Sequence, residues 1–195
     1  MAATHVPKAA RVGGAGAEAT GSLAIAGAGG KYAANADPAG APTLDPGTLP
    51  QTDEKPQVNT EHFRKLSQAL FDAIQNDDAE LALPYFFPKT AYAQVKAIKN
   101  PGQDWERRLV AAFRRDIHGY HSVLGPGARF VGLRVSGANT RFMKRGAEGN
   151  RLGYFRTTRA SLTYADSAGR ERALLVSSLI SWRGQWYVVH LNGFQ

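Results

Sequence analysis

The sequence predicts an α+β fold in which helices come first and an antiparallel sheet follows, after an N-terminal tail. From residue 60 to about 124 apolar residues recur at helical spacing, whereas after residue 127 they alternate with a period of two. Residues 1–56 are instead rich in Ala, Gly and Pro. Helices followed by strands with short turns are typical of an α+β domain. We therefore assign residues 1–56 to a disordered tail or tether and residues 57–195 to one folded domain.

The tail and the domain differ in composition and in charge. Tyr32 is the one aromatic residue of the first 56, so this segment buries too little apolar surface to offset its ordering entropy. It holds 4 basic and 5 acidic residues, which leaves 20 basic and 11 acidic residues, a net charge of +9, to the domain. That charge favours anionic ligands or surfaces, or it serves solubility, since the arginines alternate along the predicted strands.

Several classes of protein are excluded or disfavoured by what the chain lacks. It has no cysteine, which excludes disulfides, thiolate nucleophiles and cysteine-based zinc sites. No phosphate loop, dinucleotide fingerprint or nucleophile elbow is present, so we expect no cofactor. The basic residues lack the pattern of a nucleic-acid binder. No apolar run reaches the roughly 20 residues of a membrane span. The compartment stays open: cytoplasmic, or tethered to an envelope if a leader precedes this start.

The first helical segment runs from Thr60, a capping residue, to about Gln75. Its apolar face repeats at helical spacing and consists of Phe63, Leu66, Leu70 and Ile74. Asp78 is expected to cap a short second helix, which Pro84 ends.

Two further helices are expected before residue 125. Pro88 opens a third helix, with Tyr92 and Val95 facing inward. Asp104 is expected to cap a long fourth helix, which ends near Leu124 at the sequence Gly-Pro-Gly. On a helical wheel the fourth helix carries one continuous apolar stripe made of Leu109, Val110, Phe113, Ile117, Tyr120 and Leu124.

Four strands are expected after residue 127. A half-buried strand covers 128–136, and a polar loop containing Lys144, Arg145 and Gly146 follows it. Longer strands are expected near 151–165 and 170–182, and a last strand to Phe194. The sequences DSAG and RG form the turns between them, so the strands make an antiparallel meander.

The turns also predict which residues face each other. The two-residue turn Arg183-Gly184 pairs Trp182 with Gln185, Ile180 with Tyr187, Leu179 with Val188, Ser178 with Val189, Ser177 with His190 and Val176 with Leu191. The loop before it places Leu162 opposite Leu174, Tyr154 opposite Trp182 and Arg159 opposite Ser177. We expect the helices to cover the face formed by Tyr154, Leu162, Leu174, Val176, Ile180, Trp182, Tyr187, Val189 and Leu191.

The opposite face then carries a polar row of Arg159, Ser177 and His190, for which two interpretations stay open. In one, His190 is an acid or base and Arg159 its electrostatic partner at an anion or carbonyl. In the other, the row is a solvated outer face or a polar patch in a dimer contact.

The segment RRDIHGYH concentrates an acid and two histidines, but the wheel separates them. Asp116 lies at one margin of the apolar stripe and His118 about 160° away, so they form no dyad. His118 and His121 could share a metal ion, but the sequence indicates no further acidic or histidine ligand near them, so we expect no metal site. Asp116 is either paired with a sheet arginine such as Arg156 or placed in a pocket with a raised pKa.

Aromatic residues gather around the short helices. They are Tyr85, Phe86, Phe87, Tyr92 and Trp105. Such a set lines either the mouth of a pocket or the core.

Two segments resemble a known family. FRKLSQALFDAIQNDDAELALPYF is similar to the opening of NTF2-like domains of the SnoaL-like kind, and LISWRGQWYVVHLNGF, with Trp186 and His190, to their closing hairpin. The resemblance implies a cone, in which a strongly curved sheet wraps around the helices and encloses a pocket. Members of the family use this pocket for small-ligand binding, for isomerase, cyclase, dehydratase or hydrolase chemistry, or only for association. It also implies a homodimer through the outer sheet face. The family shares no single catalytic motif.

Two functional hypotheses follow. The first is a non-catalytic NTF2-like domain that binds a small ligand or a partner, held on the flexible tether; its ligand-binding candidates are Tyr85, Tyr92, Trp105, Arg159 and Ser177. The alternative is a small enzyme of the isomerase or hydrolase type, with Asp116 or His190 as general base in the pocket.

Overall fold

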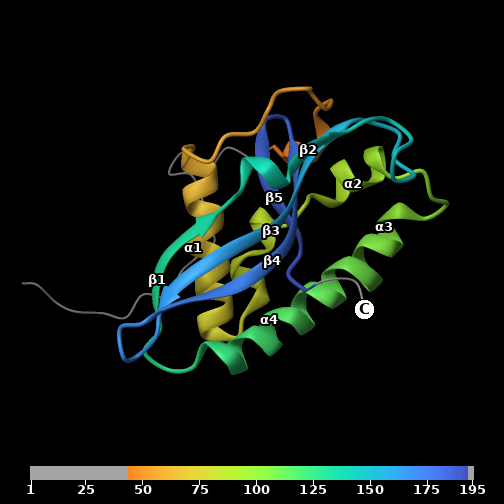
Figure 1. The fold of residues 1–195 in the computed structure, drawn as a ribbon. Coiled ribbons are helices and arrows are strands. Elements are labelled where there is room, and N and C mark those ends of the chain that lie inside the picture. Colours follow the sequence, from red (N-terminus) through yellow and green to blue (C-terminus); the bar gives the residue numbers. More distant parts are fainter. Residues whose placement is uncertain (1–43, 193–195) are drawn as a thin grey trace, which may run out of the picture. The chain divides into compact units, whose positions relative to one another are not determined.

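The computed structural model describes residues 44–192 and has the α+β architecture that the sequence predicts (Figure 1). Helices come first, and a strongly curled antiparallel sheet of five strands follows them. Most of the predicted tail, residues 1–43, lies outside the described residues, as do residues 193–195.

Helix α1 (Glu61–Asn76) begins where the sequence predicts. The hydroxyl oxygen of Thr60 accepts a hydrogen bond from the N–H of Phe63 at 3.1 Å, which satisfies one of the donors that a first helical turn leaves open. The predicted apolar face is buried in the core, and it consists of Phe63, Leu66, Leu70 and Ile74.

The expected second helix is instead a pair of 3₁₀ turns, η2 (Ala79–Leu81) and η3 (Leu83–Tyr85). Asp78 caps η2 as predicted, by accepting from the N–H of Glu80 at 3.0 Å. Pro84 lacks the N–H that a longer helix would need, which keeps the two turns separate. After Pro88, helix α2 (Lys89–Val95) buries Tyr92 and Val95, as predicted.

The long helix begins earlier than predicted. It consists of α3 (Pro101–Asp104), the π-helical turn η4 (Trp105–Val110) and α4 (Ala111–Leu124) in direct succession. Asp104 is therefore not its cap; Pro101, which has no N–H to leave unsatisfied, occupies the first turn instead. The predicted apolar stripe is buried throughout, and it consists of Leu109, Val110, Phe113, Ile117, Tyr120 and Leu124.

The sheet has one strand that the sequence analysis placed in a loop, the short strand β2. The strands are β1 (Arg129–Arg134), β2 (Thr140–Met143), β3 (Tyr154–Ala165), β4 (Glu171–Trp182) and β5 (Gln185–His190). Their order is β1-β3-β4-β5, and β2 also pairs with β3, beside the 3₁₀ turn η5 (Gly137–Asn139). β2 carries only four residues and no strong alternation, so its pattern was too weak to separate it from the loop.

The predicted register is correct near the turns and wrong beyond a bulge in β5. Trp182 faces Gln185, Leu179 faces Val188, and Leu162 faces Leu174. The register then shifts, so that Ser178 faces His190 instead of Val189. The predicted pair of Ser177 with His190 is therefore wrong, and so is that of Val176 with Leu191, since the N–H of Ser177 bonds the carbonyl of Leu191 at 3.0 Å.

The face that we expected the helices to cover is buried as predicted. All nine of its residues are at most 8 % exposed: Tyr154, Leu162, Leu174, Val176, Ile180, Trp182, Tyr187, Val189 and Leu191. Leu179 and Val188, which the prediction placed on the other face, are also fully buried. At the last hairpin the other face of the sheet is therefore also buried and is not simply exposed to solvent.

Residues 44–56, which the sequence analysis placed at the end of the tail, pack on the domain as a strap. The carbonyl of Pro46 accepts a hydrogen bond from the indole Nε1 of Trp182 at 2.7 Å. The side-chain amide of Gln51 donates to the carbonyls of Gly153 and Ser181, at 3.3 and 3.2 Å. The folded part therefore begins before the predicted residue 57, and hydrogen bonds to residues distant in the sequence tie the strap to the sheet.

Gly47 provides a test of the strap, whose 3₁₀ turn η1 (Pro46–Thr48) lies against α2. A Cβ at this position would lie 2.1 Å from the hydroxyl of Thr90 and 2.6 Å from the backbone nitrogen of Ala91. We expect Gly47→Ala to lower the free energy of unfolding by about 1–3 kcal/mol, measured by urea denaturation. Gly119→Ala is the control: its Cβ meets nothing within 4 Å, and in α4 it should stabilise by about 0.5–1 kcal/mol. Equal stabilisation by both changes would contradict the packing of the strap.

In the part of the chain that the structure describes, no helix is both long enough and apolar enough to cross a membrane.

Candidate functional site

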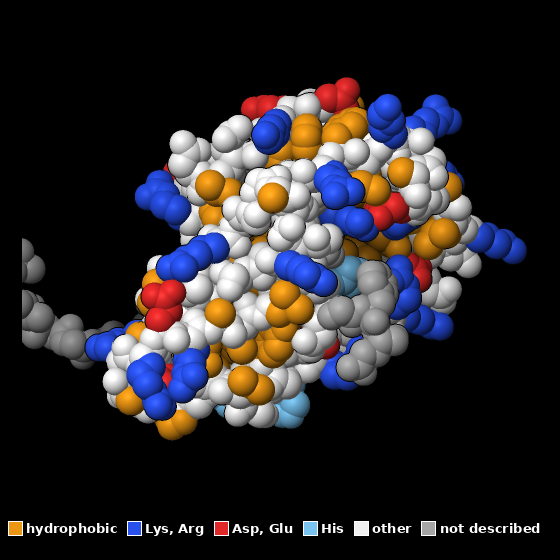
Figure 2. All heavy atoms as spheres, viewed as in Figure 1, with side chains coloured by type: hydrophobic (Ala, Val, Ile, Leu, Met, Phe, Trp, Pro, Cys, Tyr) orange, Lys and Arg blue, Asp and Glu red, His pale blue; other side chains and the backbone are white. Residues whose placement is uncertain are grey.

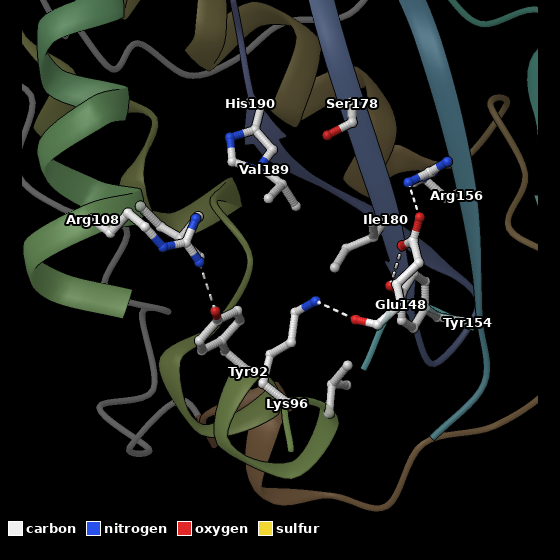
Figure 3. Close-up of a pocket in the computed structure, with 12 residues that line it drawn as sticks. Tyr92, Lys96, Arg108, Glu148, Tyr154, Arg156, Ser178, Ile180, Val189 and His190 are labelled. Atoms are coloured by element: carbon white, nitrogen blue, oxygen red, sulfur yellow. Dashed lines mark hydrogen bonds and ion pairs between the residues drawn. The ribbon is translucent and has the colours of Figure 1, made fainter. Parts of the chain in front are cut away.

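A cavity of about 230 Å³ lies between the helices and the curved sheet (Figure 3). One wall comes from α2 and η4, the opposite wall from β3 and the loop before it, and the floor from β4 and β5. Its lining residues are Tyr92, Val95, Lys96, Arg108, Leu109, Glu148, Tyr154, Arg156, Ser178, Ile180, Val189 and His190.

The helical wall includes residues of the π-helical turn η4. Arg108 and Leu109 are consecutive in η4, and both line the cavity. A π-helical turn contains more residues than an α-helical one, and such turns often occur at functional sites. Lys96 follows the last residue of α2 and extends its side chain into the same space (Figure 3).

Three polar side chains hold this wall together. The hydroxyl of Tyr92 donates to a carboxylate oxygen of Asp104 at 2.5 Å, and Arg108 donates to the Tyr92 hydroxyl at 2.9 Å. Arg108 also contacts both carboxylate oxygens of Asp104, at 2.8 and 2.7 Å. Burial, with the bond to Asp104, raises the pKa of Tyr92 to about 12. The bonds from Arg108 lower the pKa of Asp104. The tyrosine thus stays a phenol, and Arg108 is fixed beside the cavity.

The opposite wall is organised around one carboxylate, Glu148. The hydroxyl of Tyr154 donates to it at 2.7 Å, and Arg156 forms an ion pair with it. Burial, together with this hydrogen bond, raises the pKa of Tyr154 well above its usual range. Figure 3 shows Glu148, Tyr154 and Arg156 grouped across the cavity from Arg108 and Tyr92.

The loop that carries Glu148 is tied to the end of α2. The N–H of Ala97 donates to the carbonyl of Gly149 at 3.1 Å, and that of Arg151 to the carbonyl of Val95 at 2.7 Å. Asn150 is buried, and its side-chain amide donates to two carbonyls of the same loop. These bonds hold Glu148 and Lys96 in the same corner of the cavity.

His190 enters the cavity because of the bulge in β5. Ser178 faces His190 while Leu179 faces Val188, so Val189 is the extra residue on this strand. A bulge interrupts the alternation of side chains, and here the consecutive residues Val189 and His190 both line the cavity. Figure 3 shows the imidazole beside Ser178 and across from Lys96.

The cavity is electrostatically positive. Three cationic side chains line it, those of Lys96, Arg108 and Arg156, against the one carboxylate of Glu148. Burial lowers the pKa of Lys96. Burial and, after it, the charge of Arg108 lower the pKa of His190 to about 4, so its imidazole is neutral at pH 7.

Of the site residues suggested by the sequence, the structure brings Tyr92 and His190 together in this cavity. Tyr85 lies outside its lining, with its ring 5.4 Å from that of His62. Trp105 donates from its indole Nε1 to the carbonyl of Phe87 at 2.7 Å and is also outside the lining.

The other suggested residues are placed elsewhere. Asp116 forms no ion pair with Arg156; one of its oxygens accepts from the N–H of Asn192 at 3.3 Å, close enough to His190 to oppose the lowering of that pKa. Arg159 is exposed and has a φ of 55°, and Ser177 lies beside it in the register without lining the cavity.

The histidines of the segment RRDIHGYH bond at the end of α1. His118 pairs with Asp77 at 2.8 Å on the surface, and the Nδ1–H of His121 donates to the carbonyl of Ile74 at 2.9 Å. In residues 44–192 no three histidine or acidic side chains are grouped as metal ligands would be.

Sequence reasoning missed several of the polar lining residues, among them Lys96, Arg108 and Glu148. Arg156 could have been predicted as a lining residue, because the predicted register already placed it on the same face as Tyr154 and Ile180. Glu148 lies in a loop without periodicity, so no pattern in the sequence indicates where its side chain points.

Comparisons with protein-family models, with curated proteins and with solved structures found no match to this chain.

Proposed function

We propose that this protein binds a small organic anion in the cavity between its helices and its sheet, as a non-catalytic ligand-binding domain. The observation that carries the proposal is the charge of the lining: Lys96, Arg108 and Arg156 against Glu148. Two of these cations have a carboxylate partner, Arg108 with Asp104 and Arg156 with Glu148, whereas the half-buried Lys96 has none among the ion pairs of residues 44–192. Desolvation disfavours such a cation, so an anionic ligand beside it would stabilise it.

Lys96 is the cation that such a ligand would neutralise. Arg108 is paired with Asp104, and Arg156 with Glu148, at the edges of the cavity. The ammonium group of Lys96 instead donates to the backbone carbonyl of Glu148 at 3.3 Å. An acidic group beside it forms a charge-assisted hydrogen bond and returns its lowered pKa toward the usual range.

The size and the apolar walls limit the ligand further. Pockets for drug-sized ligands measure roughly 300–1,000 Å³, so a cavity of about 230 Å³ suits a smaller molecule. Its apolar walls are formed by Val95, Leu109, Ile180 and Val189. The ligand class that fits is a short acid with an apolar body.

The resemblance to NTF2-like domains supports the same proposal. The helices precede a strongly curled antiparallel sheet, and a cavity lies between them. This is the arrangement that the resemblance implies for a cone with a small-ligand pocket, and we propose membership of that superfamily on this basis. The homodimer through the outer sheet face stays a prediction.

The chemistry of His190 favours binding over catalysis. With a pKa of about 4, its imidazole is a weak base at neutral pH, whereas an efficient general base has a pKa near the working pH. Asp116, the other candidate base, lies outside the lining of the cavity.

A thermal-shift screen with matched pairs tests the proposal. Each short carboxylic acid is compared with its primary amide, which has nearly the same shape but no charge. We expect acids to raise the melting temperature of the full chain and amides to leave it unchanged; an acid at 100 times its Kd adds about 2.7 kcal/mol.

Two lysine variants test whether the thermal shift depends on Lys96. Lys96→Met is expected to abolish the shift, whereas Lys65→Met, at an exposed lysine paired with Glu61 on α1, is expected to keep it. Equal shifts from acids and amides, or no dependence on Lys96, would show the proposal to be wrong.

A further inference from the structure

A second hollow of about 220 Å³ adjoins the main cavity. Its lining, which we call the arginine pocket, consists of Ala138, Asn139, Arg141, Arg156 and Thr158. Arg156 lines both hollows. Across β3 and β4, Arg156 faces Ile180 and Thr158 faces Ser178, and these two partners line the main cavity. The two hollows are therefore neighbours on one sheet, with Arg156 between them.

The arginine pocket concentrates positive charge. Arg141 and Arg156 face each other directly across β2 and β3, and like charges at opposite positions destabilise a sheet. Glu148 compensates Arg156. Among residues 44–192 no carboxylate forms an ion pair with Arg141, and the lining of the pocket contains no acid.

The same pocket also offers neutral hydrogen-bond donors. The amide of Asn139 and the hydroxyl of Thr158 belong to its lining, beside the two guanidinium groups. Arginine presents a planar fork of donors that matches carboxylate and phosphate oxygens in a bidentate way. Because Arg156 already pairs with Glu148, a single acidic group here would pair mainly with Arg141, and it would accept hydrogen bonds from several donors at once.

We propose that the arginine pocket binds a second anionic group of the same ligand, so that the ligand is a short acid with two anionic ends. The first end lies beside Lys96 in the main cavity, and the second lies between Arg141 and Arg156. The second group is a carboxylate or a phosphate, since the oxygens of both can accept from the guanidinium fork. This inference rests on the proposed function, because it assigns the first end to that cavity.

Isothermal titration calorimetry of the full chain with short diacids and monoacids tests the inference. The diacids are succinate, glutarate and adipate, and each is compared with the monoacid that lacks one carboxylate: propionate, butyrate and valerate. One diacid is expected to bind at least about tenfold more tightly than its monoacid. Comparing the affinity of that diacid with the affinity of its phosphonate analogue shows which group, a carboxylate or a phosphate, the arginine pocket binds more tightly.

The variant Arg141→Gln tests whether the tighter binding of the diacid comes from the arginine pocket. It is expected to bring the affinity of the diacid down to that of the monoacid and to leave the monoacid unchanged. Arg129→Gln, which removes an exposed arginine from β1, is the matched control. In this variant the diacid is expected to bind more tightly than the monoacid, as in the wild type. Two results would contradict the second site and leave the proposed function standing. In the first, monoacids bind through Lys96 but the diacids bind no more tightly than the monoacids. In the second, Arg141→Gln keeps the tighter binding of the diacid. If no acid of either series binds, the proposed function is wrong, and this inference with it.

Discussion

Trp182→Ala is expected to lower the free energy of unfolding by about 3–5 kcal/mol, the range for removing a buried tryptophan or phenylalanine side chain. Trp182 has no exposed surface, and its ring lies 6.0 Å from that of Phe87. Its indole N–H also holds the strap through the carbonyl of Pro46. The truncation therefore leaves a cavity in the core and an unsatisfied carbonyl in the strap.

Urea denaturation of three variants separates these contributions. Trp182→Phe keeps much of the apolar volume but loses the hydrogen bond, so we expect an intermediate loss. Val123→Ala, at a side chain that is 64 % exposed, is the surface control and should change stability by less than about 0.5 kcal/mol. A loss below about 1 kcal/mol for Trp182→Ala would contradict its place in the core.

Acid is expected to destabilise the protein through His190. Its pKa is about 4 in the folded chain, against 6.5 for an ordinary histidine, because burial and Arg108 disfavour the imidazolium. Between these values the unfolded chain binds more protons, so stability is complete above about pH 6.5 and falls as the pH drops toward 4. Allowing for solvent screening of a ring that is not fully buried, we expect a loss of about 2 kcal/mol.

The measurement is the free energy of unfolding against pH for the wild type and for His190→Gln. The variant lacks the titrating group, so its curve should be flatter between pH 6.5 and 4. Burial also lowers the pKa of His62, whose Nε2–H donates to the carbonyl of Trp186 at 2.8 Å. His62→Gln combined with His190→Gln should therefore flatten the curve further. Parallel curves for the wild type and His190→Gln would contradict the burial of this imidazole.

The elements that the sequence predicts well are those with strong periodicity or capping. Thr60 caps α1 and the stripe around Phe113 is buried because both depend on neighbours within one helix. The register near the last turn is also correct, because the turn type determines it locally. The strap was missed because it is held by single polar contacts, such as those of Gln51, that leave no periodic signal.

The candidate site was harder to predict because it depends on irregularities. One extra residue in β5 moves His190 from the expected outer face into the cavity, and strict alternation does not reveal such a bulge. Arg108 and Leu109, two consecutive residues of the π-helical turn, also line the cavity, and a regular helical wheel does not reveal such a turn. Both irregularities lie at the cavity.

The account depends most on the claim that an anion enters this cavity, and the ring protons of His190 report on it directly. We would measure the pKa of His190 by NMR, without ligand and with the short acid that gives the largest thermal shift. A bound anion favours the imidazolium, so the pKa of His190 in the wild type is expected to rise from about 4 when the acid is added. In Lys96→Met the acid is expected to leave the pKa of His190 at the value that this variant has without ligand. A pKa of His190 that stays the same when the acid binds would contradict the central claim.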